Sequence, residues 1–133
     1  MARKIIAAAI RERRVVNAAD LLKLVVGTDV VPAVVGYQAA DSGRGGHGAR
    51  WYVYRPDMMT GTRSSSNWHG AMEFPVYGPE DKVARLAEAI AWTSTAYDID
   101  PEGWERLPGR FHGGWYPTAT LDAIEAALAS QEG

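Results

Sequence analysis

The feature that most constrains the fold is a helical pattern of apolar residues in the second half of the chain. Gly78 and Pro79 interrupt the chain just before it, and Pro79, Glu80 and Asp81 suit the first turn of a helix. The residues that follow recur at helical spacing and include one small polar member: Val83, Leu86, Ala87, Ile90, Ser94 and Tyr97. We predict a long helix over residues 79–97 that buries this stripe, so the rest of the chain must provide a surface for it to cover.

Trp92 lies on the opposite side of this predicted helix. At about 100° per residue it falls roughly half a turn from Val83, on the polar face between Arg85 and Glu88. An indole on a polar helix face is either covered by another segment or exposed to a partner. The aromatic segment 104–116 is the natural cover within the chain. We favour that packing and keep Trp92 as a candidate binding residue.

Strands are predicted at about residues 30–37, 50–55 and 71–77. Each stretch is rich in β-branched or aromatic residues, and the second, RWYVYR, lies between a glycine-rich segment and a proline. Pro32 and Pro75 restrict the first and third strands to edge or first-position places, and a short helix is the rival interpretation of the first. A three-stranded antiparallel meander with helices on one face is the economical way to bury these patterns, which predicts an α+β fold.

Helices are also predicted at both ends of the chain. Residues 3–26 carry two apolar helical patterns and predict one interrupted helix or two short ones. A last helix over residues 120–130 turns an apolar stripe inward: Leu121, Ile124 and Leu128. Residues 98–109 are predicted as turns, and the irregular aromatic stretch 110–117 as a loop or a short strand.

Size and composition narrow the class of protein. A chain of 133 residues predicts a single domain over 1–133, with mobile loops at the glycine-rich segment 41–49 and the serine-containing segment 57–70. The chain has no cysteine, which excludes disulfides, thiol nucleophiles and cysteine-ligated metals. No apolar run reaches the roughly 18 residues of a membrane span. We expect a small soluble, cytoplasmic protein with no cofactor, no metal and no membrane partner.

Charge is divided unevenly along the chain. Residues 1–70 carry ten Lys or Arg against five Asp or Glu, a net +5, whereas residues 71–133 carry four against eleven, a net −7. A basic half offers a place for an anionic partner, and an acidic half offers a place for the basic half itself. We predict that the acidic C-terminal segment lies against the basic half, within one chain or across a dimer, unless a polyanion occupies it.

The strand predicted at 50–55 carries the main candidate binding residues. Trp51 and Val53 point to one face and suit a core, so Arg50, Tyr52 and Tyr54 point to the other. A guanidinium beside aromatic rings can neutralise phosphate while the rings stack on bases. The alternative is structural, because tyrosine is a good strand residue and its ring can pack against a neighbouring segment.

Loop residues carry the remaining candidates. The chain has three histidines, and each precedes a glycine: His47, His69 and His112. Converging loop histidines would suit a base or a metal site, but no two are spaced as a helix-borne zinc pair. Arg63 and the serines after it can hold an oxyanion, although the spacing is not that of a phosphate-binding loop. We assign no catalytic residue and keep Arg63 and His69 as candidate binding residues.

These patterns predict a small, non-enzymatic binding or accessory protein that acts through a surface. Its predicted partner is another protein, and a homodimer is one form that this interaction could take. The first alternative is a nucleic-acid-binding domain that uses the basic half and the Arg50, Tyr52 and Tyr54 face. The second is a small hydrolase or transferase that uses the loop histidines.

Overall fold

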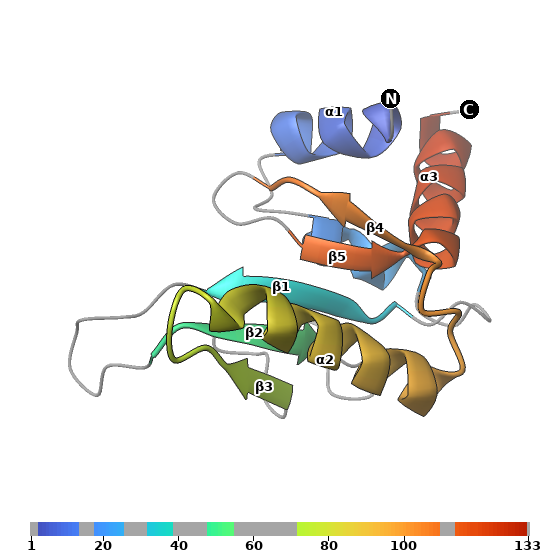
Figure 1. The fold of residues 1–133 in the computed structure, drawn as a ribbon. Helices are drawn as coiled ribbons and strands as arrows, with labels where there is room; N and C mark the ends of the chain where they lie inside the picture. Colours follow the sequence, from blue (N-terminus) through green and yellow to red (C-terminus); the bar gives the residue numbers. More distant parts are fainter. Residues whose placement is uncertain are drawn as a thin grey trace.

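The computed structural model describes residues 3–13, 18–25, 32–38, 48–54, 72–109 and 114–132. Within these residues a five-stranded sheet lies between one long helix and a group of three shorter helical segments (Figure 1). The elements are α1 (Lys4–Arg13), the 3₁₀ helix η1 (Ala18–Val25), β1 (Val34–Gln38), β2 (Arg50–Tyr54), β3 (Met72–Pro75), α2 (Asp81–Tyr97), β4 (Trp104–Leu107), β5 (Gly114–Pro117) and α3 (Thr118–Glu132). The α+β class predicted from the sequence is confirmed.

The sheet is larger than predicted. Its strand order is β3-β2-β1-β5-β4, and every neighbouring pair is antiparallel. The three predicted strands do form a meander, but β5 pairs with the free side of β1, and β4 pairs with β5. Sequence patterns missed β4 because its four residues, WERL, lie between turn-forming prolines and glycines. Its strand conformation depends on a partner that comes later in the chain.

Of the two prolines, Pro75 lies where the sequence predicted and Pro32 does not. Pro75 is the last residue of β3, which is an edge strand. Pro32 does not place the first strand at an edge, because β1 begins only at Val34 and lies at the centre of the sheet. The N-terminal region forms two separate helical segments, and α3 extends beyond the predicted 120–130 at both ends.

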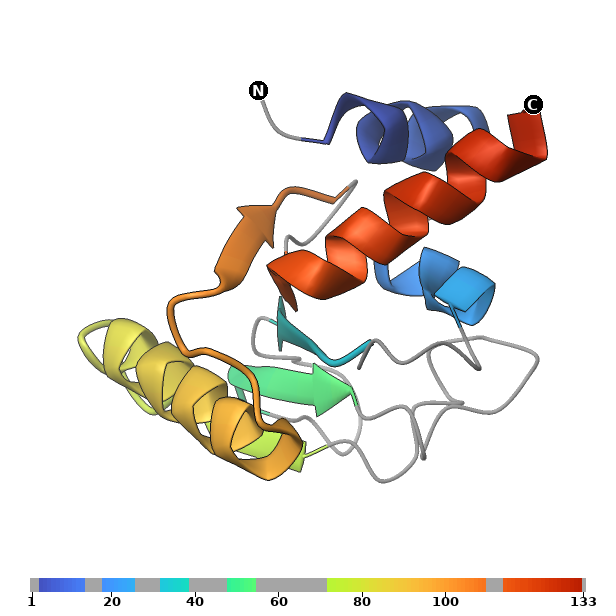
Figure 2. The same cartoon turned by 90° about the vertical axis from the view of Figure 1, so that its right-hand side faces the viewer.

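Both faces of the central strand are buried, and the helices are divided between them. Val34 and Val35 are adjacent in β1, so their side chains point to opposite faces, and both are inaccessible to solvent. Val35 belongs to a core beneath α2, together with Trp51, Val53, Phe74, Ala89 and Trp104. Val34 belongs to a second core, built with α1, η1 and α3. Figure 2 shows α2 on one side of the sheet and these three segments on the other.

The buried face of α2 differs from the predicted stripe. Its buried residues are Ala89, Thr93 and Ser94, whereas Val83 and Ala87 are exposed. The buried face is therefore centred about a fifth of a turn around the helix from Val83, and Ser94 belongs to both the predicted and the observed face. This rotation brings Trp92 toward the sheet, where its ring centroid lies 6.4 Å from that of Phe74 on β3. The prediction that Trp92 packs within the chain is confirmed, although Phe74 was not the predicted cover.

Ser94 has a specific structural role. Its side-chain oxygen accepts a hydrogen bond of 3.0 Å from the indole Nε1 of Trp104 on β4, and both residues are buried. A buried indole N–H without an acceptor would cost about 1–3 kcal/mol. The polar residue in the apolar stripe of α2 therefore joins that helix to a strand that the sequence did not reveal.

Candidate functional site

The start of α2 is fixed to the sheet by aromatic residues. The indole Nε1 of Trp51 donates a hydrogen bond of 3.0 Å to the backbone carbonyl of Lys82, in the first turn of the helix. The Lys82 ammonium lies 4.0 Å from the centroid of the Tyr37 ring, and that ring lies 4.9 Å from Trp51, centroid to centroid. Such contacts between cation and ring and between rings favour one placement of the helix. The junction between β3 and α2 is therefore held firmly.

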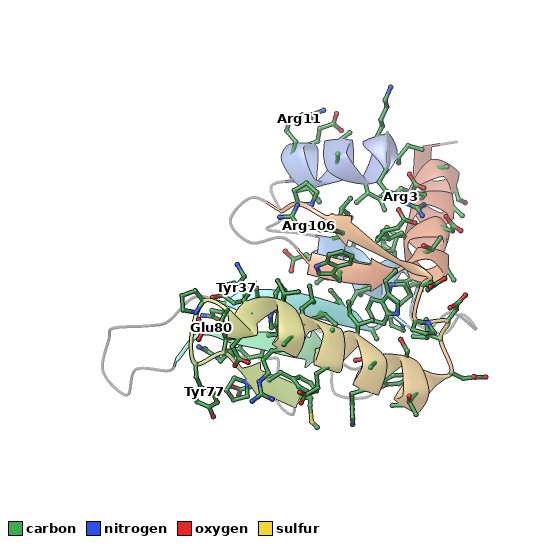
Figure 3. The ribbon with its side chains drawn as sticks, in the orientation of Figure 1. Arg3, Arg11, Tyr37, Tyr77, Glu80 and Arg106 are labelled. Atoms are coloured by element: carbon green, nitrogen blue, oxygen red, sulfur yellow. The ribbon has the colours of Figure 1, made fainter. Side chains whose placement is uncertain are left out.

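Two large apolar side chains project from this junction. Tyr77, just after β3, is 82% exposed, and Val83, in the first turn of α2, is 75% exposed. The backbone N–H of Tyr77 donates to Asp81 Oδ2 at 3.3 Å, so the backbone is positioned while the ring points outward. Figure 3 shows Tyr77 and Glu80 at the end of the sheet where α2 begins.

Further exposed apolar residues lie along α2. The residues that face solvent on this side are small or β-branched: Val83, Ala84, Ala87, Ala91 and Thr95. We call these residues, together with Tyr77, the α2 outer surface. The two basic residues of the helix have partners within the chain. Lys82 lies over the Tyr37 ring, and the Arg85 guanidinium pairs with the carboxylates of Asp81 and Glu88, with N–O distances of 3.3 and 3.0 Å. Hydrogen bonding to Asp81 raises the pKa of Arg85. α2 therefore presents a strip of exposed apolar residues that is flanked by acidic residues.

Arg50 and Tyr52 do lie together, as the sequence predicted. Arg50 Nε donates to the Tyr52 hydroxyl at 2.6 Å, Arg50 Nη1 donates to the Gly48 carbonyl at 2.6 Å, and Glu73 Oε1 lies 3.3 Å from Nε. The arginine is only 6% exposed. The guanidinium is therefore paired with a carboxylate and a hydroxyl in its own sheet, and a phosphate would have to compete with Glu73 for it.

The other predicted binding residues do not join Arg50. Trp92 contacts Phe74, which pairs with Trp51 across β2 and β3, so it lies on the opposite face of the sheet from Arg50. Two of the candidates, Arg63 and His69, fall outside the described residues, as does the side chain of Tyr54. The loops predicted at 41–49 and 57–70 fall almost wholly outside them too, as do all three histidines: His47, His69 and His112.

A cluster of charges joins the two ends of the chain. The Arg3 guanidinium forms two hydrogen bonds with Glu105 on β4, and its Nη1 lies 2.6 Å from Asp122 and 2.5 Å from Glu125 on α3. The Arg3 side chain is 9% exposed. Its hydrogen bonds lower the pKa of Glu105, and the same bonds raise the pKa of Arg3. The prediction that C-terminal acidic residues lie against the basic half is confirmed for Arg3.

Sequence reasoning missed the α2 outer surface because it assigned Val83 to the core. A second pattern was present at the same helical spacing, since Leu86, Ala89 and Thr93 also recur on one side. That pattern leaves Trp92 beside the core and Val83 outside it, as the structure does. The small residues of the second pattern gave it a weaker hydrophobic signal, although small residues allow a helix to approach a sheet closely.

Within the described ranges, no group of three or more His, Cys, Asp or Glu is arranged to hold a metal ion. The helices of that part of the chain are too short or too polar to cross a membrane. No protein-family model, no curated protein and no solved structure matches this chain. The chemistry and geometry of its own residues are therefore the basis for a functional assignment.

Proposed function

We propose that this is a small, non-enzymatic binding protein that engages a protein partner through the α2 outer surface. The observation that carries the proposal is the exposure of Tyr77 and Val83 at a junction that is otherwise firmly packed. Single exposed apolar residues are ordinary on protein surfaces. Here an exposed aromatic residue precedes a helix whose outer face carries an exposed β-branched residue and a strip of small apolar residues, which is typical of an interaction site.

The physical case for a protein partner has two parts. An exposed tyrosine supplies a large contact area at low cost in side-chain entropy, and tyrosine is enriched among residues that dominate binding energy. The backbone beneath Tyr77 and Val83 is fixed by Trp51, Lys82 and Asp81, so little ordering is needed on binding. Rigid presentation of an aromatic anchor is what a protein interface requires.

The nucleic-acid alternative is less well supported by the described residues. Its central cation, Arg50, is nearly buried and lies beside Glu73, whose negative charge would repel a phosphate. The hydrolase or transferase alternative depends on His47, His69 and His112, none of which is among the described residues. Neither alternative gains an observation comparable with the α2 outer surface.

An affinity pull-down from the source cell tests the proposal. The baits are the wild-type chain, the double variant Tyr77→Ser with Val83→Ser, and the control Ala126→Lys, which changes an exposed residue of α3. Both altered chains should unfold at nearly the wild-type temperature, because surface substitutions usually change stability by about 0.5 kcal/mol or less. Each pull-down is run with and without nuclease.

We expect a protein that is retained by the wild-type and Ala126→Lys baits, lost from the double variant, and unaffected by nuclease. Retention of the same proteins by all three baits would refute a role for the α2 outer surface. Loss of every captured protein after nuclease treatment would transfer support to the nucleic-acid alternative.

A further inference from the structure

The charge around the α2 outer surface is strongly one-sided. Residues 80–102 contain six acidic residues and two basic ones, a net charge of −4. The acidic residues are Glu80, Asp81, Glu88, Asp98, Asp100 and Glu102. Both basic residues already have partners within the chain, because Lys82 stacks on Tyr37 and Arg85 binds Asp81 and Glu88. Glu80, Asp98, Asp100 and Glu102 are exposed.

The placement of the acidic residues at the end of α2 opposes the ordinary preference of a helix. The last turn of α2 has no basic residue, and Asp98 occupies the C-cap in a left-handed conformation, with φ of 55°. A helix C-terminus carries a partial negative charge of about half an electron, so acidic residues there are disfavoured. Asp98, Asp100 and Glu102 add to that charge. This end of the helix is therefore a point of strong attraction for a cation.

We infer that the partner of the α2 outer surface is an amphipathic helix with small or aliphatic residues along one face and lysine or arginine at its ends. The inference rests on the proposed function and specifies the partner's chemistry. Alanines at 84, 87 and 91 recur at helical spacing and let a second helix approach closely. Acidic residues at both ends of the strip, Glu80 and Asp98, call for cations on the partner.

A second copy of this chain fits the surface poorly. If two α2 helices packed antiparallel, Glu80 of one would face Asp98 of the other, and if they packed parallel, each acidic residue would face its own copy. Like charges in juxtaposition oppose association. A partner that is apolar along its face and basic at its ends satisfies both parts of the surface.

Three synthetic peptides test the inference against the full chain. Each has about 17 residues, the length of α2. The first is an amphipathic helix of alanine and leucine with lysines at both ends. The second replaces the lysines with glutamates, and the third is a scramble of the first that keeps its charge but has no apolar face. Binding is measured by fluorescence anisotropy, and the contact site is mapped from amide chemical shifts along α2.

We expect only the lysine-ended amphipathic peptide to bind at low salt. Its Kd should rise about tenfold between about 0.05 and 0.5 M salt, where screening shortens to a few ångströms. Ala87→Lys should abolish binding, and Ala126→Lys on α3 should leave it unchanged. Asp98→Asn together with Asp100→Asn should weaken binding about three- to tenfold through the loss of attraction.

The other outcomes count against the inference in distinguishable ways. Equal binding of the glutamate-ended peptide, if still lost in Ala87→Lys, would overturn the basic partner and leave the proposed function standing. Equal binding of the scramble would show that charge alone attracts the peptide, which overturns the helix-on-helix contact. Failure of all three peptides to bind would also overturn the inference. The proposed function is tested separately by the pull-down, which does not depend on these peptides.

Discussion

Gly114 shows how closely one residue of the sheet is constrained by its neighbour. A Cβ added there would lie 3.0 Å from the Tyr116 hydroxyl and 3.1–3.2 Å from two atoms of its ring. Tyr116 is buried, so it has little room to move. We predict that Gly114→Ala lowers the free energy of unfolding by about 1–3 kcal/mol.

Gly48→Ala is the matched control for this change. No atom of the residues that the structure describes lies within 4 Å of the Cβ position at Gly48, so the same substitution should change the free energy of unfolding by about 0.5 kcal/mol or less. Chemical denaturation of the two variants provides the comparison. Equal stability of the two would show that the Tyr116 ring can move aside.

Glu105 should make stability depend on pH. Its hydrogen bonds from Arg3 lower its pKa in the folded state, so the stabilisation is fully present above its unfolded pKa of about 4.3. The stabilisation is then lost as pH falls through the lower, folded pKa. At pH 7, Glu105→Gln should cost about 1.5–3 kcal/mol, the value of a hydrogen bond to a charged group.

Urea unfolding at a series of pH values checks this prediction. The difference in unfolding free energy between the wild-type chain and Glu105→Gln should be constant above about pH 5 and shrink below about pH 4. The control Glu102→Gln alters an exposed acidic residue three positions away and should show a smaller difference. A difference that grew on acidification would contradict the assigned direction of the pKa shift.

At the scale of elements, α2 provides a direct test of which side faces the core. Ala89 is fully buried and Ala87 is exposed, although only one residue separates them. Ala89→Leu should overfill the core beneath Trp51 and Phe74 and cost about 1–3 kcal/mol. Ala87→Leu should change the free energy of unfolding by about 0.5 kcal/mol or less. Thermal or chemical denaturation distinguishes them, and the reverse ranking would restore the stripe predicted from the sequence.

The elements that the sequence revealed are those whose signals are local. A proline before α2, apolar spacing within α3, and β-branched or aromatic runs at β1 and β2 all depend on nearby residues. By contrast, β4 was missed, and the short strand suggested within 110–117 was placed only loosely, because β4 and β5 have four residues each and take their strand conformation from pairing with residues elsewhere in the chain. The orientation of α2 was also missed, because a helix with alanine on several sides has weak amphipathic contrast.

In the candidate site, too, the sequence predicted the features that depend on nearby residues and missed those that depend on tertiary packing. Alternation along β2 correctly placed Arg50 beside Tyr52 and opposite Trp51. Their burial could not be read from the pattern, because it depends on Glu73 and on the tertiary packing of the sheet. The exposure of Tyr77 and Val83 likewise depends on the final angle of α2.

At the scale of the whole molecule, the uneven distribution of charge should stabilise the fold. Asp122→Lys together with Glu125→Lys replaces two carboxylates around Arg3 with like charges but leaves the apolar stripe of α3 in place. We predict a loss of about 1–2 kcal/mol at low salt that becomes much smaller at about 1 M salt, where the screening length is roughly 3 Å. Glu102→Lys is the control, because Glu102 is exposed and the ion pairs of Arg3 are made with Glu105, Asp122 and Glu125. Salt-independent destabilisation would mean that packing dominates over charge.

The position of β1 at the centre of the sheet determines when the protein can finish folding. Val35 pairs with Trp115, which lies 80 positions later in the chain (115 − 35). During synthesis at about 5–20 residues per second, one edge of β1 therefore waits roughly 4–16 s for β5 to emerge. An unpaired strand edge can pair with another chain during that interval. The nascent protein is thus most prone to aggregation in the seconds before β5 emerges, and a chaperone acting then would protect it most.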